Sequence, residues 1–177
     1  RNRGWNGAWA GGYGVSLQEY RAFIASKAPQ VSMAGFDPKP INPASKAHQT
    51  VALEYALRKG RSAAFLDTGL GKSFIELEFA RQCAEETGMP SLILTPLAVA
   101  GQMVREGRKF GIDARQIREQ SEVGSGVMVA NYERLPKLDP AAFGAVILDE
   151  SSILKSYAGQ TRAKIQEAFR DTPFKLA

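Results

Sequence analysis

The sequence predicts an α/β fold with a mainly parallel central sheet flanked by helices, arranged in three layers. Short apolar runs alternate with longer segments of helical periodicity throughout residues 44–177, which is the pattern of repeated strand–helix–strand units. One such run passes into a glycine-rich turn at residues 69–71 that opens a helix. Another run, residues 145–148, ends in two adjacent carboxylates, and ligands of a parallel sheet bind at that edge.

Residues 1–43 are predicted to form an N-terminal extension, and the α/β domain is predicted to cover residues 44–177. The extension starts with a glycine-rich tail, whose composition opposes fixed structure. Ser16 and Glu19 fit a capping box that would begin a short helix, and this helix is expected to stop before Pro29. The prolines that follow favour an irregular connector.

Helices and strands are then expected in alternation. The first helix of the domain is followed by Lys59 and Gly60, a cation and a glycine that fit a C-cap. The almost wholly apolar run at residues 91–95 fits a strand buried on both faces of a parallel sheet, and Pro96 ends it. The helices are expected at residues 45–58, 73–86, 98–110 and 161–170. The strands are expected at residues 62–66, 91–95, 126–130, 145–148 and 174–177, with a further short strand through Ile117.

Apolar spacing indicates which helical faces are buried. Ile75, Phe79 and Cys83 recur every four residues, so they share one face of their helix. Cys83, the only cysteine, is therefore predicted to be a packed thiol. In the first helix of the domain the residues expected to be buried are Val51, Leu53, Tyr55, Ala56 and Leu57.

Composition excludes several classes of protein. With one histidine and one cysteine in 177 residues, a structural zinc site is excluded. No apolar run approaches the roughly 20 residues that cross a bilayer, and no secretory signal pattern is present. We therefore expect a cytoplasmic location, with which a lone cysteine agrees. The net charge of +5 is compatible with nucleic acid but does not identify a partner.

The turn before Lys72 has the composition of a phosphate-binding loop. Its glycines let backbone N–H groups point inward, the new helix adds the positive end of its dipole, and Lys72 adds a charge. Ser73 supplies a hydroxyl for Mg²⁺. Leu66 stands where the usual pattern has its first glycine. The nucleotide-binding residues predicted in this loop are Thr68, Gly69, Leu70, Gly71, Lys72 and Ser73.

Asp149 and Glu150 indicate what happens to the bound phosphate. Asp149 is placed to hold Mg²⁺ through water, and Glu150 to polarise the water that attacks the γ-phosphate. Adjacent residues at a strand end point in different directions, which suits two separate roles. Lys72 and the two carboxylates are the predicted catalytic residues. The predicted chemistry is Mg²⁺-dependent hydrolysis of a nucleoside triphosphate.

Residues 65–73 and 148–155 together resemble two motifs of the superfamily-two, DEAD/DEAH-box helicases. The likeness is greatest to the Swi/Snf-like DNA translocases and their phage or prophage relatives. This resemblance covers residues 44–177 and implies a RecA-like P-loop domain, the N-terminal motor lobe of an ATP-dependent helicase or translocase. Gln49 matches the glutamine motif, which implies that it contacts the adenine edge and that the cofactors are ATP and Mg²⁺.

The resemblance also implies a nucleic-acid partner, with duplex DNA favoured, in a bacterial or phage-infected cell. Thr95 and Pro96, followed by Gln102, match a motif that contacts one nucleic-acid strand. Asn131 and Tyr132 match a second segment on the same face. A strand end and a packed aromatic residue would explain the same residues almost equally well.

Two features depart from the family pattern. Ser151 and Ser152 replace the residues that couple hydrolysis to motion, and Ser73 replaces the commoner threonine but keeps the hydroxyl. The chain ends at Ala177, just before the expected coupling motif, so a second lobe is expected to come from the remainder of a longer protein. That lobe supplies arginine fingers, which raise the rate by roughly 10³–10⁵ in related enzymes. The isolated chain is therefore expected to bind ATP weakly and to hydrolyse it poorly.

Two other interpretations fit part of the sequence. A P-loop kinase or signalling NTPase also needs a phosphate loop, although Gln49 and the acidic pair disfavour it. A nucleic-acid-binding module without catalysis would explain Leu66, Ser151 and Ser152. Phosphate transfer to an acceptor would support the first alternative. DNA affinity that does not change with ATP and Mg²⁺ would support the second.

Overall fold

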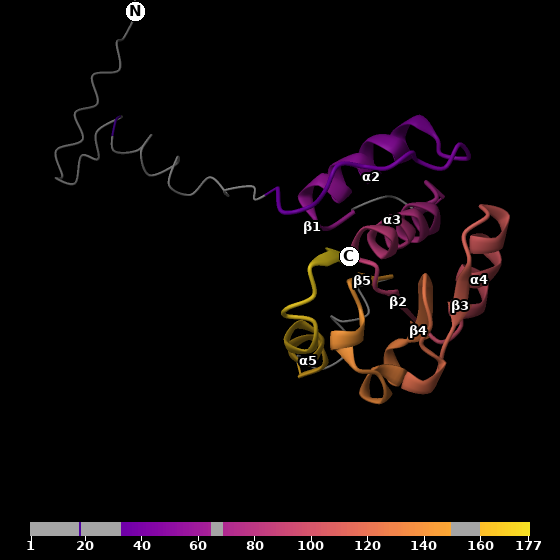
Figure 1. The fold of residues 1–177 in the computed structure, drawn as a ribbon, viewed down its shortest axis with the longest axis vertical. Helices are drawn as coiled ribbons and strands as arrows, with labels where there is room; N and C mark the ends of the chain where they lie inside the picture. The colour runs from indigo at the N-terminus through magenta and orange to yellow at the C-terminus, as the bar shows by residue number, and fades with distance from the viewer. Residues whose placement is uncertain (1–17, 19–32, 65–68, 150–159) are drawn as a thin grey trace, which may run out of the picture. The chain divides into compact units, whose positions relative to one another are not determined.

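The computed structural model describes residue 18 and residues 33–64, 69–149 and 160–177 (Figure 1). The predicted N-terminal tail and helix lie outside these ranges except for Gln18. Five residues singled out in the sequence also lie outside them: Leu66, Thr68, Glu150, Ser151 and Ser152. Residues 33–177 form one compact unit, so residues 33–43 of the connector belong to it.

The elements of this unit follow the predicted alternation. The helices are α2 (Ala47–Lys59), α3 (Lys72–Thr87), α4 (Ala100–Lys109) and α5 (Gln160–Ala168). The strands are β1 (Arg61–Ser62), β2 (Ser91–Thr95), β3 (Ala114–Gln116), β4 (Val127–Asn131), β5 (Ala145–Leu148) and β6 (Phe174–Leu176). Short 3₁₀ segments are η1 (Gln120–Glu122), η2 (Tyr132–Lys137) and η3 (Pro140–Ala142). Among the described helices, none combines the length and hydropathy that a membrane span requires.

The described strands form one parallel sheet in the order β1-β6-β5-β2-β4-β3. Strand β2 is central, with Ser91 opposite Val127 on one side and Ala145 on the other. Strand β1 is shorter than predicted, although the N–H of Ala64 still donates to the carbonyl of Ala177 (2.8 Å). Because all the pairs are parallel, the carboxyl ends of the strands meet at one edge of the sheet.

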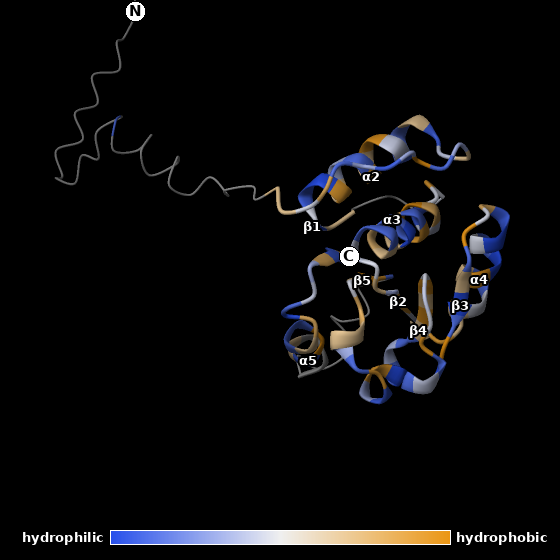
Figure 2. Ribbon diagram, viewed as in Figure 1, coloured by the Kyte–Doolittle hydropathy of each residue, from blue (hydrophilic) through white to orange (hydrophobic). Residues whose placement is uncertain are grey.

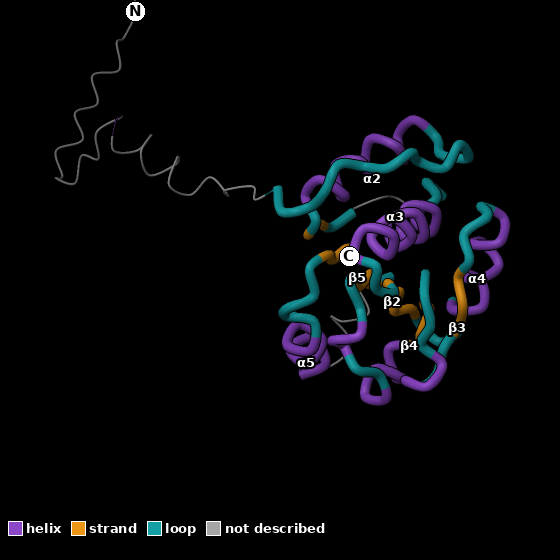
Figure 3. Tube along the Cα trace, in the orientation of Figure 1, coloured by secondary structure: helices purple, strands orange, loops and turns teal. Residues whose placement is uncertain are grey.

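Helices cover both faces of the sheet, which confirms the three-layer α/β class. Successive strand residues face opposite sides. Ile93 packs with α2, α3 and α4 in one core, whereas Leu92 and Leu94 pack with α5 and the segments around η2 and η3 in the other. Figure 2 shows apolar residues on the inner strands, and Figure 3 shows those strands enclosed by helices.

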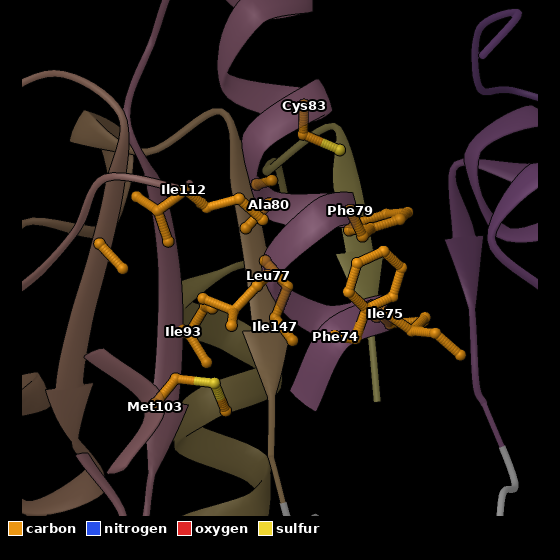
Figure 4. Close-up of a cluster of buried hydrophobic side chains, with 14 of the residues drawn as sticks. Phe74, Ile75, Leu77, Phe79, Ala80, Cys83, Ile93, Met103, Ile112 and Ile147 are labelled. Carbon is orange, nitrogen blue, oxygen red and sulfur yellow. The ribbon is translucent and has the colours of Figure 1, made fainter. Parts of the chain in front are cut away.

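Helix α3 lies between α2 and the sheet (Figure 1) and carries Lys72 at its first position. Its apolar side chains fill the larger core, where Leu77 lies beside Ile93 (Figure 4). The predicted burial of Ile75, Phe79 and Cys83 is confirmed. Burial raises the pKa of the Cys83 thiol above its usual value, so a packed, inert thiol is the correct interpretation.

The buried face of α2 differs in part from the prediction. Leu53 and Ala56 are buried as expected, but Val51 is 70% and Tyr55 is 50% exposed, so the prediction for these two residues is wrong. The helix packs through the stripe that contains Leu53 and Ala56, and the opposite stripe faces solvent. The ring of Tyr55 lies 5.4 Å from the ammonium of Lys59, which gives it a favourable contact at the surface.

The connector before α2 is irregular, as predicted, and a polar network ties it to α3. Glu78 is fully buried and accepts two hydrogen bonds from Arg81 (2.6 and 2.8 Å) and one from the amide of Gln82 (3.0 Å). It also accepts the backbone N–H of Asn42 (3.2 Å). Gln82 exchanges hydrogen bonds with the backbone of Lys39 (2.9 and 3.3 Å). The hydrogen bond to Glu78 raises the pKa of Arg81, so its guanidinium stays charged.

Candidate nucleotide-binding site

The loop before α3 exposes its backbone at the start of a long helix. Gly69 and Gly71 have φ angles of 87° and 75°, a region that side-chain-bearing residues rarely adopt. Gly71 is the N-cap of α3, and residues 69–71 are exposed. The first N–H groups of a helix lack internal partners, and the helix dipole is positive there. The described part of the loop therefore suits a phosphate group.

Lys72 and Asp149 lie together, although they belong to distant parts of the sequence. Asp149 follows β5, and its N–H donates to the carbonyl of Leu94 (2.9 Å), which continues the strand pairing. The Oδ1 atom of Asp149 lies 3.7 Å from the Nζ atom of Lys72. The fold thus brings the lysine of the glycine-rich loop and the first carboxylate of the acidic pair into one site.

Glu76 is a third charged residue of this site, and it belongs to none of the sequence motifs described above. It lies one helical turn after Lys72, and its Oε1 atom is 3.5 Å from the Nζ atom of Lys72. The side chain of Glu76 is 2% exposed, that of Asp149 14% and that of Lys72 29%. The spacing of four residues on a predicted helix was the available signal, because such residues are neighbours.

The donor atoms at this site fit a magnesium ion. Mg²⁺ prefers hard oxygen ligands and usually binds through one or two carboxylates, several waters and substrate phosphates. Asp149 offers a carboxylate, and Ser73 offers a hydroxyl from the half-buried first turn of α3. Within the described ranges no three His, Cys, Asp or Glu side chains cluster as metal ligands. This donor set suits an ion that arrives with a nucleotide.

The side chain of Gln49 is hydrogen-bonded to the glycine-rich loop and holds it in place. Its amide nitrogen donates to the carbonyls of Leu70 (3.0 Å) and Gly71 (3.3 Å), and its amide oxygen accepts the N–H of Lys46 (2.9 Å). The residue is 4% exposed. The ring Nε2 of His48 also contacts the carbonyl of Leu70 (3.2 Å). In this arrangement the side chain of Gln49 links the start of α2 to the loop, and its contact with adenine stays a prediction.

Replacing Gly71 with alanine should disrupt this link. A Cβ atom at Gly71 would lie 2.3 Å from the amide nitrogen of Gln49, whereas one at Gly69 would meet no atom of the described residues within 4 Å. Both substitutions strain the backbone by about 1–2 kcal/mol. We expect Gly71→Ala to destabilise the protein by about 1 kcal/mol more than Gly69→Ala, because a hydrogen bond is also lost. Urea unfolding of both variants measures the difference. An equal loss of unfolding free energy in the two variants would contradict the role of Gln49 in holding the loop.

The residues predicted to bind nucleic acid lie along the carboxyl edge of the sheet, but they differ in exposure. Thr95 and Asn131 are paired in register at the ends of β2 and β4, and both are buried. The hydroxyl of Thr95 donates to the carbonyl of Pro96 (3.1 Å). Gln102 is exposed on α4, where its amide donates to Glu106 (3.0 Å). Direct contacts with nucleic acid stay predictions for these residues.

Tyr132 connects this edge to the nucleotide site. Its hydroxyl donates to the backbone carbonyl of Asp149 (2.7 Å). Tyr132 immediately follows β4, and Asp149 immediately follows β5. The hydrogen bond therefore joins the ends of two strands that flank β2, and it fixes the carbonyl of the residue whose carboxylate faces Lys72.

Removing the hydroxyl of Tyr132 should lower the stability of the protein modestly. We expect Tyr132→Phe to lower the free energy of unfolding by about 1 kcal/mol, the net contribution of one hydrogen bond, and the melting temperature by about 2–4 °C. Tyr55→Phe is the matched control, because Tyr55 is exposed on α2. Thermal unfolding of both variants checks this, and an equal melting temperature for the two would show that the bond contributes nothing.

A separate open depression of about 410 Å³ lies at edge strand β3. Arg115, Gln116, Arg118 and Glu122 line it. Among the described residues that line it, none is predicted from the sequence to bind nucleotide or nucleic acid. The charges that define the candidate site are those of Lys72, Glu76 and Asp149.

No protein-family model matches the sequence, and no curated protein matches it. Solved structures do match the fold. The UvsW helicase of bacteriophage T4 has a TM-score of 0.64 at 19% identity, with 92% of this chain and 59% of that chain covered. The SWI2/SNF2 ATPase core of Sulfolobus solfataricus, solved in complex with double-stranded DNA, has a TM-score of 0.64 at 17% identity, with 80% of this chain and 33% of that chain covered.

A hypothetical ATP-dependent RNA helicase from Sulfolobus tokodaii is also similar, with a TM-score of 0.52 at 16% identity, over 89% of this chain and 48% of that chain. The chain thus spans less than two thirds of each of these structures. At such identities the likeness establishes the fold alone, and it confirms the predicted RecA-like α/β fold.

Proposed function

We propose that this helicase-type fold is the first motor lobe of an ATP-dependent DNA helicase or translocase, which binds ATP with Mg²⁺ and hydrolyses it. The observation that carries the proposal is the meeting of Lys72 and Asp149, 3.7 Å apart, at the carboxyl edge of the sheet. A phosphate loop alone supports only phosphate binding. A carboxylate beside its lysine adds a group that can hold a metal ion, which hydrolysis of a nucleoside triphosphate requires.

In this proposal each residue of the site has a distinct role. The exposed loop backbone and the ammonium of Lys72 bind the phosphates, and Gln49 fixes the loop from below. The hydroxyl of Ser73 and the carboxylate of Asp149 hold Mg²⁺, which neutralises phosphate charge when bound. Glu150 follows Asp149 in the sequence and is assigned to orient the attacking water.

We further propose that the carboxyl edge of the sheet faces duplex DNA. A structure of similar fold contains double-stranded DNA, and the chain has a net charge of +5. Because the chain covers 59% or less of the structures quoted above, a second lobe of a longer protein is proposed to complete the cleft. The cytoplasm of a bacterial or phage-infected cell is the proposed location.

Titration with a fluorescent ATP analogue and Mg²⁺ tests nucleotide binding by the 177-residue chain. We expect saturable binding, competition by unlabelled ATP and a low rate of phosphate release. Addition of a short DNA duplex should change the nucleotide affinity, because both ligands bind one edge of the sheet. No nucleotide binding would overturn the proposal. Phosphate transfer to an added acceptor would favour a kinase. A DNA affinity that does not change when nucleotide is added would favour a non-catalytic module.

A further inference from the structure

Glu76 is an unusual neighbour for a lysine that is assigned to bind phosphate. Its carboxylate is almost wholly buried and lies 3.5 Å from the ammonium of Lys72, which also faces Asp149 at 3.7 Å. Among the described residues, two carboxylates therefore lie against one ammonium. The charges of these three described side chains sum to a negative value at the place where a phosphate is proposed to bind.

Helix stability does not explain a carboxylate at this position. A lysine that precedes a glutamate by four residues is the less favourable order for a helical ion pair. Lys72 also lies at the positive end of the helix dipole, which disfavours a cation. Burial of the Glu76 side chain adds a desolvation cost. The arrangement suggests a role in ligand selection.

The charges have opposite effects on two forms of a nucleotide. A bare triphosphate must draw Lys72 away from both carboxylates and must then lie near the negative charge of Glu76. A metal–nucleotide complex is less negative, and its cation is attracted by the same carboxylates. These interactions are strong because Glu76 is shielded from water.

We propose that Glu76 makes this site selective for the magnesium complex of a nucleoside triphosphate over the bare nucleotide. The inference rests on the proposed nucleotide function and adds a specificity-determining residue to it. Glu76 acts as a positioning residue through Lys72 and through its own charge. No step of hydrolysis is assigned to it.

The test compares the affinity for ATP with excess Mg²⁺ and with EDTA, for the 177-residue chain and for its Glu76→Gln variant. We expect Glu76→Gln to raise the affinity for bare ATP by about tenfold and to change that for the magnesium complex by less than about threefold. Glu76→Met, which removes the charge by another route, should act in the same direction. Glu85→Gln is the control, because Glu85 is an exposed glutamate of α3 that pairs with Arg81.

A structural role for Glu76 would lower the melting temperature but leave the ratio of the two affinities unchanged. An unchanged ratio in both variants, with nucleotide still bound, would overturn the inference alone. Absence of binding of either ATP form to the unmodified chain would overturn the proposed function and the inference together. If Glu85→Gln reduces the preference for the magnesium complex as much as Glu76→Gln does, the effect is due to net charge. This result would also overturn the inference.

Discussion

Replacement of Lys72 by alanine is expected to lower the affinity of the chain for ATP and Mg²⁺ by roughly 10–100-fold. Hydrogen bonds to charged groups contribute about 1.5–3 kcal/mol, and each 1.4 kcal/mol is a tenfold change in affinity. The ammonium of Lys72 is held at the start of α3 and 3.7 Å from Asp149, so its contact with phosphate has no substitute in the variant. Equilibrium titration with a fluorescent ATP analogue measures the loss.

Lys39→Ala is the matched control for this change. Lys39 also pairs with a carboxylate, that of Glu86 at 3.3 Å, and its exposure is similar to that of Lys72. The structure places Lys39 in the connector, outside the candidate site, so its replacement should leave nucleotide affinity within about twofold, as expected for a surface pair. If Lys72→Ala binds as tightly as Lys39→Ala, then Lys72 does not contact the phosphates and the proposed site is wrong.

The parallel sheet was predictable because its strands are buried on both faces. Strands of this kind appear as short, continuous apolar runs, and residues 91–95 and 145–148 match β2 and β5 to the residue. The glycine turn before α3 was predictable for a related reason. Glycines with positive φ, followed at once by lysine and serine, leave few alternatives for the local backbone. Both signals depend on neighbouring residues alone.

The remaining features depend on tertiary contacts that a single sequence does not display. Val51 and Tyr55 fit a helical apolar stripe, but α2 packs through the stripe that contains Leu53. The contact with the neighbouring α3 determines which of the two stripes is buried. The hydrogen bonds from the amide of Gln49 to the loop carbonyls were not predicted, and its contact with adenine stays a prediction. Charged residues on helices usually face water, so the four-residue spacing from Lys72 does not by itself predict that Glu76 is buried beside it.

Glu78 is the strongest case of such a contact, and its replacement should have the largest effect on stability. We expect Glu78→Ala to lower the free energy of unfolding by about 3 kcal/mol. The substitution leaves Arg81 without its buried partner, and breaking a buried ion pair costs about 3–5 kcal/mol. The lower end of this range applies because the side chain of Arg81 is 26% exposed. The amide of Gln82 and the N–H of Asn42 also lose an acceptor.

Thermal unfolding should show this loss as a fall of roughly 10 °C in melting temperature, since about 2–4 °C corresponds to 1 kcal/mol in a chain of this size. Glu85→Ala is the control, because Glu85 pairs with the same arginine from an exposed position, and it should cost less than about 1 kcal/mol. The network ties the connector to the helix that begins with Lys72, so Glu78→Ala should also weaken nucleotide binding as α3 loosens. If both variants have the same melting temperature, the buried network does not hold the connector to α3.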